Sequence, residues 1–393
     1  MRYSRIGCKL DGIGGPPCKS MYFHHNGSRG VATMSTGTWK SNRLVKYVGT
    51  GLGIATILFI AISFIATKIV YDKQFPRYDR PDENTTAHLR YSDIATDYPR
   101  IPVSFESGGN VLRGHIYGSD NTRGLLVIAH GLGGGADSYL PQIKHFVDSG
   151  LRVFAYDSTG SYDSGGKTTK GFPQAVVDLH AALTFIAGQP NLSELPLLLF
   201  GHSWGGYAVV NVLNYPHDVK GVVSVSGVNT AIDMIMEQGE ALMGGFIHTQ
   251  FPFLWLYQRL LFGNIASFDA VSAIHATGVP VLVIHGTADE MVAYDGSALI
   301  AHRDEISNPL VRYVTVDTAG RNGHNNLFRT DEAITYIDEV NALYRTIYDN
   351  YDGQIPYGIK KDFYDNVDRM LLQELEPSLM QTIDGFIDDA LRR

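Results

Sequence analysis

A serine flanked by glycines stands where an apolar run gives way to a second apolar stretch. The pentapeptide GHSWG occupies residues 201–205, after Leu197–Phe200 and before Tyr207–Leu213. A sharp strand-to-helix turn lifts a serine hydroxyl out of the backbone, and it needs small neighbours because helix and strand nearly touch there. The glycine-serine-glycine spacing alone is weak evidence. With a strand before it and a helix after it, the motif predicts that Ser203 is a nucleophile.

A serine hydroxyl needs a base that takes its proton and a carboxylate that orients the base. Asp289 follows a strand expected to end near Ile284, and His324 lies in a glycine-containing loop after a later strand. Because the carboxyl ends of parallel strands share one edge of a sheet, both side chains can reach Ser203. We predict His324 as the general base and Asp289 as the orienting acid. Glu290 adjoins Asp289 and is the alternative acid, or a surface charge.

Two further histidines, His202 and His285, stand beside strand ends, and we expect both to be hydrogen-bonded structural residues. Acyl transfer also needs backbone N–H donors aimed at the developing oxyanion. The amide of Trp204 is one candidate. The amide of Leu132 is the other, because the glycine-rich loop 130–135 lets the backbone approach a substrate closely. That loop lacks the lysine of a nucleotide-binding loop and the spacing of a dinucleotide site.

Short apolar strands alternate with helical patterns from about residue 100 onward. This alternation predicts an α/β fold with a mostly parallel central sheet flanked by helices. Nearly fifty residues, about 228–276, separate two of the strands, and this apolar insertion is expected to be a helical cap over the site, with ordinary core helices as the alternative. The last sixty residues are expected to form helices. The predicted strands are 111–117, 125–129, 151–156, 197–200, 219–225, 279–284 and 311–316.

Charge is distributed unevenly along the 393 residues, of which the first 46 carry a net charge of +7 and the remainder −15. An acidic main body leaves no basic stripe for phosphates, which argues against a nucleic-acid partner and for a small-molecule ester or short peptide. Both cysteines, Cys8 and Cys18, fall in the basic leader and have no neighbouring ligand cluster. We therefore expect no metal site and no organic cofactor.

The segment from Tyr47 to Thr67 contains no charged residue and is long enough to cross a bilayer. We expect a disordered basic leader at 1–46, a transmembrane signal anchor at 47–70, a stalk at 71–100 and the catalytic domain at 101–393. A cleavable signal peptide is the alternative to a retained anchor. The basic charges close to the two ends of the span are equal in number, but the leader as a whole is strongly basic. We therefore expect a single-pass cell-membrane protein with the leader inside and the catalytic domain outside. Met34 is an alternative start to Met1.

The loop at His130, the elbow at Ser203, the strand end at Asp289 and the loop at His324 together resemble the α/β-hydrolase superfamily. The resemblance covers about residues 100–346 and is greatest to the serine-aminopeptidase-like and lysophospholipase-like branch, which includes membrane-anchored members. Many relatives have an Asp-x-Arg-Gly-x-Gly-x-Ser segment where this chain has residues 157–164. Here Thr159 stands in place of the arginine.

The resemblance maps the nucleophile, acid and histidine of the superfamily onto Ser203, Asp289 and His324, in the same order along the chain. It implies a serine hydrolase of the carboxylesterase or lipase type, which cleaves an apolar or acyl ester through an acyl-enzyme intermediate. A serine-aminopeptidase-like peptidase is the nearest alternative. A catalytically silent scaffold that binds a partner is an alternative of a different class.

Overall fold

The computed structural model describes residues 38–393, with side chains from Arg43 onward. Most of the expected leader, with Cys8, Cys18 and Met34, lies outside the described residues. The chain divides into two compact units between Ile57 and Leu58, and the second unit holds the sheet. The strands are β1 (Arg100–Ser107), β2 (Asn110–Tyr117), β3 (Leu125–Ala129), β4 (Arg152–Tyr156), β5 (Leu197–His202), β6 (Val219–Val225), β7 (Val281–Gly286) and β8 (Val311–Val316).

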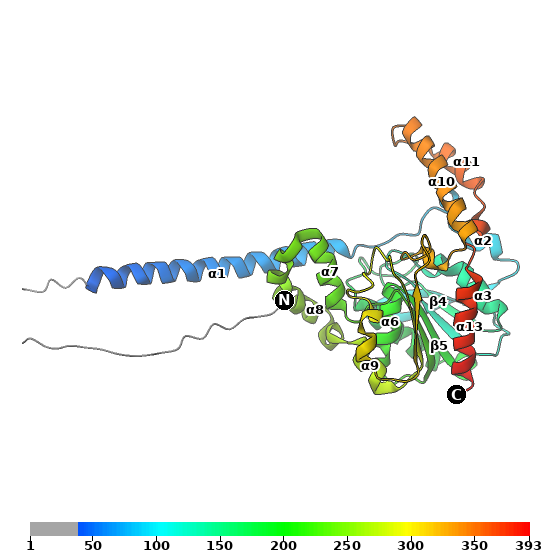
Figure 1. The fold of residues 1–393 in the computed structure, drawn as a ribbon, viewed down its shortest axis with the longest axis horizontal. Coiled ribbons are helices and arrows are strands. Elements are labelled where there is room, and N and C mark those ends of the chain that lie inside the picture. The colour runs from blue at the N-terminus through cyan, green and yellow to red at the C-terminus, as the bar shows by residue number, and fades with distance from the viewer. Residues whose placement is uncertain (1–37) are drawn as a thin grey trace, which may run out of the picture. The chain divides into compact units, whose positions relative to one another are not determined.

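The helices cover the sheet and extend beyond it. They are α1 (Thr38–Gln74), α2 (Tyr91–Ile94), α3 (Leu140–Asp148), α4 (Gln174–Ala187), α5 (Pro190–Ser193), α6 (Trp204–Asn211), α7 (Ala231–Met243), α8 (Ile247–Phe262), α9 (Ala270–Thr277), α10 (Asp331–Asn350), α11 (Tyr357–Asp365), α12 (Arg369–Leu372) and α13 (Pro377–Leu391). Figure 1 shows α6 and α9 on one side of the strands and α3 and α13 on the other.

One eight-stranded sheet organises the domain, in the order β1-β2-β4-β3-β5-β6-β7-β8. The strands from β4 to β8 in this order pair in parallel, whereas β2 pairs antiparallel with both β1 and β4. The carboxyl ends of β3, β5 and β7 therefore lie along the same edge. This arrangement confirms the predicted α/β fold with a mostly parallel sheet.

Two hydrophobic cores lie on opposite faces of the sheet, because successive strand residues point to opposite sides. In β3, Leu125 and Val127 contribute to the core beneath α4, α6 and α9, whereas Leu126 and Ile128 contribute to the core beneath α3 and α13. All four side chains have at most 1% of their surface exposed. Burial on both faces explains the continuous apolar runs that identify these strands in the sequence.

The structure differs from the sequence-based expectation in two elements of the sheet region. Strand β1 was not predicted, because it is an edge strand with only Phe105 and Ser107 buried and therefore lacks an apolar run. The insertion at 228–276 holds α7 and α8, as expected for a cap, but it also includes most of α9. Buried Ala270, Ala273 and Ile274 place α9 in the layer that covers the sheet.

The segment after α1, expected as a stalk, packs against the domain that holds the sheet. Arg77 donates hydrogen bonds to the carbonyls of Tyr162, Ser164 and Gly166. Tyr78 exchanges backbone hydrogen bonds with Gly160 and Tyr162, at 2.9 and 2.8 Å. Further along, the buried residues Leu89 and Ile94 join the core beneath α3. The segment is thus held to the domain along its length.

Helix α1 contains the only stretch of residues 38–393 that is both long and apolar enough to cross a membrane, Arg43–Gln74. At the other end of the chain, α10 and α12 pack around a small cluster that contains Val340, Val367 and Leu372. The final helix, α13, lies directly on the sheet and buries Ile383, Phe386 and Ile387.

The turn between β5 and α6 depends on two glycines. A Cβ on Gly205 would lie 1.9 Å from the carbonyl oxygen of Ala129, and a Cβ on Gly201 would lie 2.2 Å from the carbonyl oxygen of Gly205. Both obstacles are backbone atoms of neighbouring core elements, which cannot move aside cheaply. Helix α6 can approach β3 and β5 this closely only because these positions carry no side chain.

Replacing Gly205 by alanine should therefore destabilise the domain by about 3 kcal/mol or more, because the added methyl group overpacks the junction. Equilibrium urea unfolding in detergent measures the change. The matched control is Gly385→Ala in α13, where a Cβ meets nothing within 4 Å. The control should gain about 0.5–1 kcal/mol, since alanine is the better helix former. Equal effects of the two substitutions would contradict this account of the turn.

Candidate active site

Ser203 occupies the turn between β5 and α6 with a backbone conformation that is unusual for a residue with a side chain. Its φ of 57° and ψ of −116° lie outside the common regions. The surrounding hydrogen bonds hold it there: its N–H donates to Val225 at 2.8 Å, and its carbonyl accepts from Tyr207 at 3.0 Å. Strain of this kind persists only where the surroundings impose it, and it is concentrated at functional sites.

Asp289 and His324 form a buried pair at the same edge of the sheet. Asp289 follows β7, His324 lies in the loop after β8, and the side chain of Asp289 has no exposed surface. The imidazole Nδ1 of His324 lies 2.8 Å from both carboxylate oxygens. A donor at Nδ1 leaves Nε2 as the nitrogen that can accept a proton. The structure therefore brings together the predicted acid and the predicted base.

Asp289 is also the hydrogen-bond acceptor for its own loop. Its Oδ1 accepts from the amides of Met291 and Val292 at 3.0 and 2.8 Å, and its Oδ2 lies 3.2 Å from His285 Nε2. Burial alone would raise the pKa of this carboxyl. The donors from His285 and His324 outweigh that effect and hold the pKa of Asp289 well below its usual range. The carboxylate is therefore an anion at neutral pH.

Glu290, the alternative acid, has a different contact. Its carboxylate accepts from the backbone N–H of His324 at 3.0 Å and makes no hydrogen bond with the imidazole. It therefore fixes the loop that carries the histidine, whereas Asp289 contacts the ring itself. His285, expected to be structural, donates from Nε2 to the carbonyl of Val292 at 3.0 Å.

A chain of hydrogen bonds connects the three loops of the site. The N–H of Gly131 donates to the Tyr139 hydroxyl at 3.0 Å, and this hydroxyl lies 2.9 Å from His202 Nδ1. His202 Nε2 in turn lies 2.9 Å from the carbonyl oxygen of His324. Because a carbonyl can only accept, Nε2 carries the hydrogen and Nδ1 accepts from Tyr139. The direction of every bond in the chain is thereby fixed.

His202 must be neutral to make both of these bonds, and its surroundings favour that state. Burial lowers its pKa to about 3, and the neighbouring His324 ring adds to the effect. The expected structural role of His202 is borne out by these contacts. Its ring also packs against that of His324, with centroids 4.8 Å apart. The base loop is thus held against the residue that directly precedes Ser203.

The Ser203 hydroxyl makes no hydrogen bond with His324 in the described structure. The serine is half-buried, and its β-carbon lies 3.5 Å from the position that a Cβ on Gly131 would occupy. Ser203, His324 and Asp289, the residues predicted as nucleophile, base and acid, thus lie on three neighbouring loops, and the hydrogen bond between His324 and Asp289 is formed. Long or missing nucleophile–base bonds are common before substrate binds.

The two predicted oxyanion donors border the serine. Trp204 is the first residue of α6, and Leu132 follows Gly131 at the carboxyl end of β3. Neither backbone amide donates a hydrogen bond to another group in the described structure. A free amide at the start of a helix is suited to stabilise a developing negative charge.

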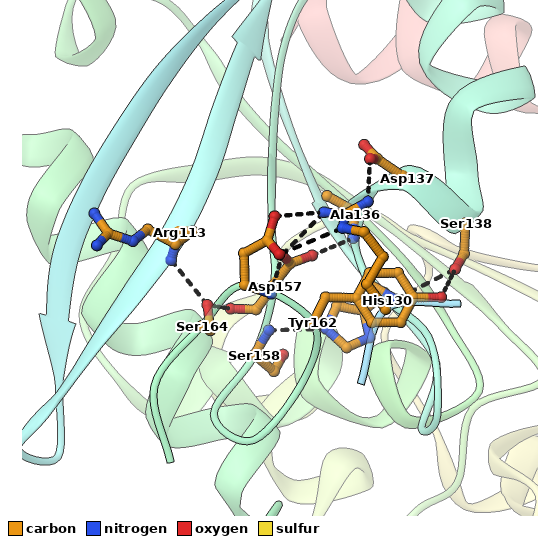
Figure 2. A network of polar contacts seen from close by, with 12 residues as sticks. Arg113, His130, Ala136, Asp137, Ser138, Asp157, Ser158, Tyr162 and Ser164 are labelled. Carbon is orange, nitrogen blue, oxygen red and sulfur yellow. Dashed lines mark hydrogen bonds and ion pairs between the residues drawn. The ribbon is translucent and has the colours of Figure 1, made fainter. Parts of the chain in front are cut away.

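A second polar network, not anticipated from the sequence, supports the loop that contains Leu132 (Figure 2). Asp157 is fully buried and accepts from the amides of Ala136 and Asp163, at 2.8 and 3.2 Å. Burial raises the pKa of Asp157 to about 6, against the opposing effect of these donors. Its place at the start of the 157–164 segment was the signal in the sequence, but its contact with Ala136 joins residues 21 apart in the chain.

His130 is the second member of this network. Its Nε2 accepts from the amide of Ser158 at 2.9 Å, so its Nδ1 carries the hydrogen that is donated to Gly131 at 2.7 Å. Burial lowers the pKa of His130 to about 4. The neutral imidazole therefore joins the start of the glycine-rich loop to the segment after β4.

Arg80, from the segment after α1, contributes a positive charge to this region. It pairs with Asp137 at 2.5 Å and with Asp163 at 2.7 Å, and it lies 3.8 Å from Asp157. Thr159, which stands where relatives have an arginine, instead bonds to the buried carboxylate of Asp178. The nearby Tyr78 ring lies 3.5 Å from where a Cβ on Gly133 would be.

Within residues 38–393, no cluster of three or more His, Cys, Asp or Glu side chains is arranged to hold a metal ion.

A surface hollow of about 730 Å³ lies at the amino ends of β6 and β7, lined in part by Pro216, Val219 and Pro280. Ligands of parallel sheets bind at the carboxyl ends of the strands. The hollow is therefore on the opposite edge from Ser203.

A strained serine between strand and helix, with an Asp–His pair at the same sheet edge, defines the α/β-hydrolase class. A family model described as serine aminopeptidase, S33, matches residues 120–273, from before β3 into α9. This range contains the loop of Leu132, the turn of Ser203 and the cap. The match covers less than half of the chain; together with the sheet order it supports an α/β-hydrolase fold.

Curated relatives are similar over part of the chain. A polyketide transferase of Aspergillus fumigatus, af380, is 27% identical over 121 residues, which are 30% of this chain and 41% of that protein. A monoacylglycerol lipase of Mycolicibacterium smegmatis is 26% identical over 215 residues, covering 46% of this chain and 75% of the lipase. The chain spans less than half the length of the two polyketide transferases that it matches.

Solved structures with a similar fold include the esterase Pf2001 of Pyrococcus furiosus. One of its structures has a TM-score of 0.48 and 17% identity, and the likeness covers 67% of this chain and 96% of the esterase.

Acidification from pH 7 to pH 5 should lower the free energy of unfolding. His130 and His202 have pKa values of about 4 and about 3 in the folded chain, against 6.5 for an unperturbed histidine. Below pH 6.5 the unfolded chain binds protons that the folded chain excludes, and each histidine then costs about 2 kcal/mol at pH 5. Urea unfolding at the two pH values measures the difference. His130→Gln should reduce the stability difference between pH 7 and pH 5 by about 2 kcal/mol. An unchanged difference would refute the conclusion that His130 is buried in its neutral form.

Proposed function

We propose that the protein is a serine hydrolase that cleaves carboxylic esters with an apolar acyl group, through an acyl-enzyme on Ser203. The observation that carries this proposal is the buried Asp289–His324 pair, which is held against the residue preceding a strained serine. Two free backbone amides, from Leu132 and Trp204, border the same serine. This combination is suited to acyl transfer and uses no cofactor.

In the proposed reaction, Ser203 Oγ attacks the ester carbonyl carbon while His324 Nε2 accepts the hydroxyl proton. Asp289 holds the other ring nitrogen and stabilises the imidazolium that forms. The amides of Leu132 and Trp204 donate to the oxyanion of the tetrahedral intermediate. The intermediate expels the alcohol, which takes the proton from His324. A water molecule, deprotonated by the same histidine, then releases the acid and restores the serine.

Two observations support an apolar substrate near a membrane. The relatives include a monoacylglycerol lipase and two polyketide transferases, and the cap helices α7 and α8 are rich in large apolar residues. We further propose that α1 is a single membrane anchor in the cell membrane, with the catalytic domain outside the cytoplasm. The length and apolar composition of α1 support the anchor.

Peptide hydrolysis is a second candidate, favoured by the family description of the match as a serine aminopeptidase. The same nucleophile and base can attack an amide. A preference for amino-acid amides with a free amino terminus over acyl esters would support this candidate. Turnover of a series of p-nitrophenyl esters of rising chain length, compared with amino-acid p-nitroanilides, decides between the two.

Replacing Ser203 by alanine should abolish turnover and leave the fold intact. Without the hydroxyl there is no covalent acceptor, so labelling by a fluorophosphonate probe should also disappear. Circular dichroism and the urea midpoint are the controls for folding. Full activity in the variant would refute the nucleophile. A wild-type chain that folds but neither reacts with the probe nor turns over any ester or amide would favour the catalytically silent scaffold.

Replacing Asp289 by asparagine should lower kcat by roughly 10³–10⁴-fold, because the amide no longer stabilises the imidazolium and favours the wrong ring tautomer. The matched control is Glu290→Gln, whose carboxylate contacts only the backbone of His324. We expect a loss of roughly tenfold or less for the control. Steady-state hydrolysis of p-nitrophenyl butyrate measures both variants. A larger loss in the Glu290 variant would mean that Glu290, and not Asp289, orients the imidazole.

A further inference from the structure

Cap helix α8 is apolar on the side that faces away from the protein as well as on the side that is buried. Its buried side includes Leu254 and Tyr257. A helix at a water-exposed surface would carry polar residues on its outer side. Here the outer side of α8, the preceding turn and the last residues of α7 expose large apolar residues by 42–71%, namely Leu242, Met243, Phe246, Phe251, Trp255, Leu256, Leu260 and Leu261.

The charge pattern of this region is equally unusual for a water-exposed surface. Residues 241–258 contain no Asp, Glu, Lys or Arg, although the chain as a whole has 72 such residues among its 393. The first charged residue is Arg259, whose guanidinium lies 5.8 Å from the ring of Trp255. Tryptophan and arginine side chains are typical of the boundary between lipid and water.

The same helix packs against the C-terminal part of α1, as Figure 1 also shows. The rings of Phe253 and Phe59 have centroids 6.1 Å apart, and those of Tyr257 and Phe64 are at the same separation. Because the contacts occur in the same order along both helices, α8 runs parallel to α1 at this interface. The contacts continue to Tyr71, whose ring centroid lies 5.3 Å from that of Tyr257.

Polar contacts begin at one end of this helix pair. The Tyr257 hydroxyl donates to Asp72 at 2.6 Å and lies 3.4 Å from the Lys68 ammonium. Phe59 is nine residues before Lys68, which corresponds to about 14 Å along a helix. If the membrane surface lies at Asp72, toward which Lys68 extends its ammonium group, Phe253 is in contact with a part of α1 that lies within the hydrocarbon region, and Tyr257 and Leu260 lie just beneath the surface.

We propose that the tip of the cap, residues 242–261, is inserted into the lipid leaflet through which α1 leaves the membrane, with lipid acyl chains as its occupant. This inference rests on the proposed anchoring of α1 and extends it to a second, independent element. The other end of the cap reaches the site: α7 donates from Gln238 to the carbonyl of Met291, and Glu237 accepts from Ala293 and Ser297. Apolar esters would thus be taken from the leaflet.

Depth measurements on the full chain test the insertion directly. In a background with both cysteines replaced by serine, a nitroxide is placed at Phe246, at Leu260 or at the control position Leu343, an exposed leucine of α10. In phosphatidylcholine nanodiscs, the two cap labels should collide more with oxygen than with a water-soluble nickel chelate, and Phe246 should lie deeper than Leu260. Leu343 should show the reverse preference.

Two outcomes of that experiment would overturn the proposal. Cap labels that are as accessible to the nickel chelate as the Leu343 label would show that the tip is in water. The spectra of the cap labels could also broaden because labels on two chains lie close together. If this broadening disappears in nanodiscs that hold a single chain, and the chelate reaches the labels there, a second copy covers the tip. Neither result depends on hydrolysis, so the depth test remains valid even if the proposed activity fails.

A functional comparison tests the consequence for substrate supply. Leu260→Glu should lower hydrolysis of a long-chain monoacylglycerol in the nanodisc by at least tenfold, because a carboxylate opposes insertion. Its hydrolysis of water-soluble p-nitrophenyl acetate should stay within twofold of the wild-type chain. The matched control, Leu343→Glu, should leave both rates unchanged. Equal losses on both substrates in the Leu260 variant would mean that the substitution damages the catalytic site, and would count against the proposal.

Discussion

The hydrogen-bond chain from Gly131 through Tyr139 and His202 to the backbone of His324 is the constraint on which the arrangement of the site depends. It joins the loop that contains Leu132, the turn of Ser203 and the loop of His324, which follow three different strands. Because His202 is neutral and its Nε2 donates to the His324 carbonyl, its Nδ1 accepts from the Tyr139 hydroxyl, which in turn accepts from the Gly131 amide. The three loops are therefore positioned relative to one another before any substrate binds.

Burial and local hydrogen bonds give neighbouring groups of the site different charge states. His202 and His130 are kept neutral by burial, whereas Asp289 is kept ionised by its donors. His324 lies between these environments, with its ring against His202 and its Nδ1 on the carboxylate. A buried anion that is fully hydrogen-bonded costs little to retain, and it orients the imidazole without competing for its proton.

The parts of the structure that could be predicted from the sequence are those in which local pattern and function coincide. Buried parallel strands leave continuous apolar runs, and Ser203, Asp289 and His324 follow the carboxyl ends of three such runs, so they could be named as candidate site residues from the sequence. Edge strand β1 was not, because half-exposed polar residues resemble a loop. The network of Asp157 and the role of Tyr139 were equally inaccessible, since their partners are 21 and 63 residues away and meet only in the fold.

The docked segment after α1 sets how far the catalytic domain can move from its proposed anchor. Helix α1 ends at Gln74, and Tyr78 is already paired with the backbone of Gly160 and Tyr162. Only three residues lie between, which span about 10 Å when fully extended. So short a linker does not allow the domain to move away from the membrane surface into the surrounding solution. An enzyme held in this way would sample only the molecules that diffuse past it in its own leaflet, and two-dimensional diffusion would limit its encounters.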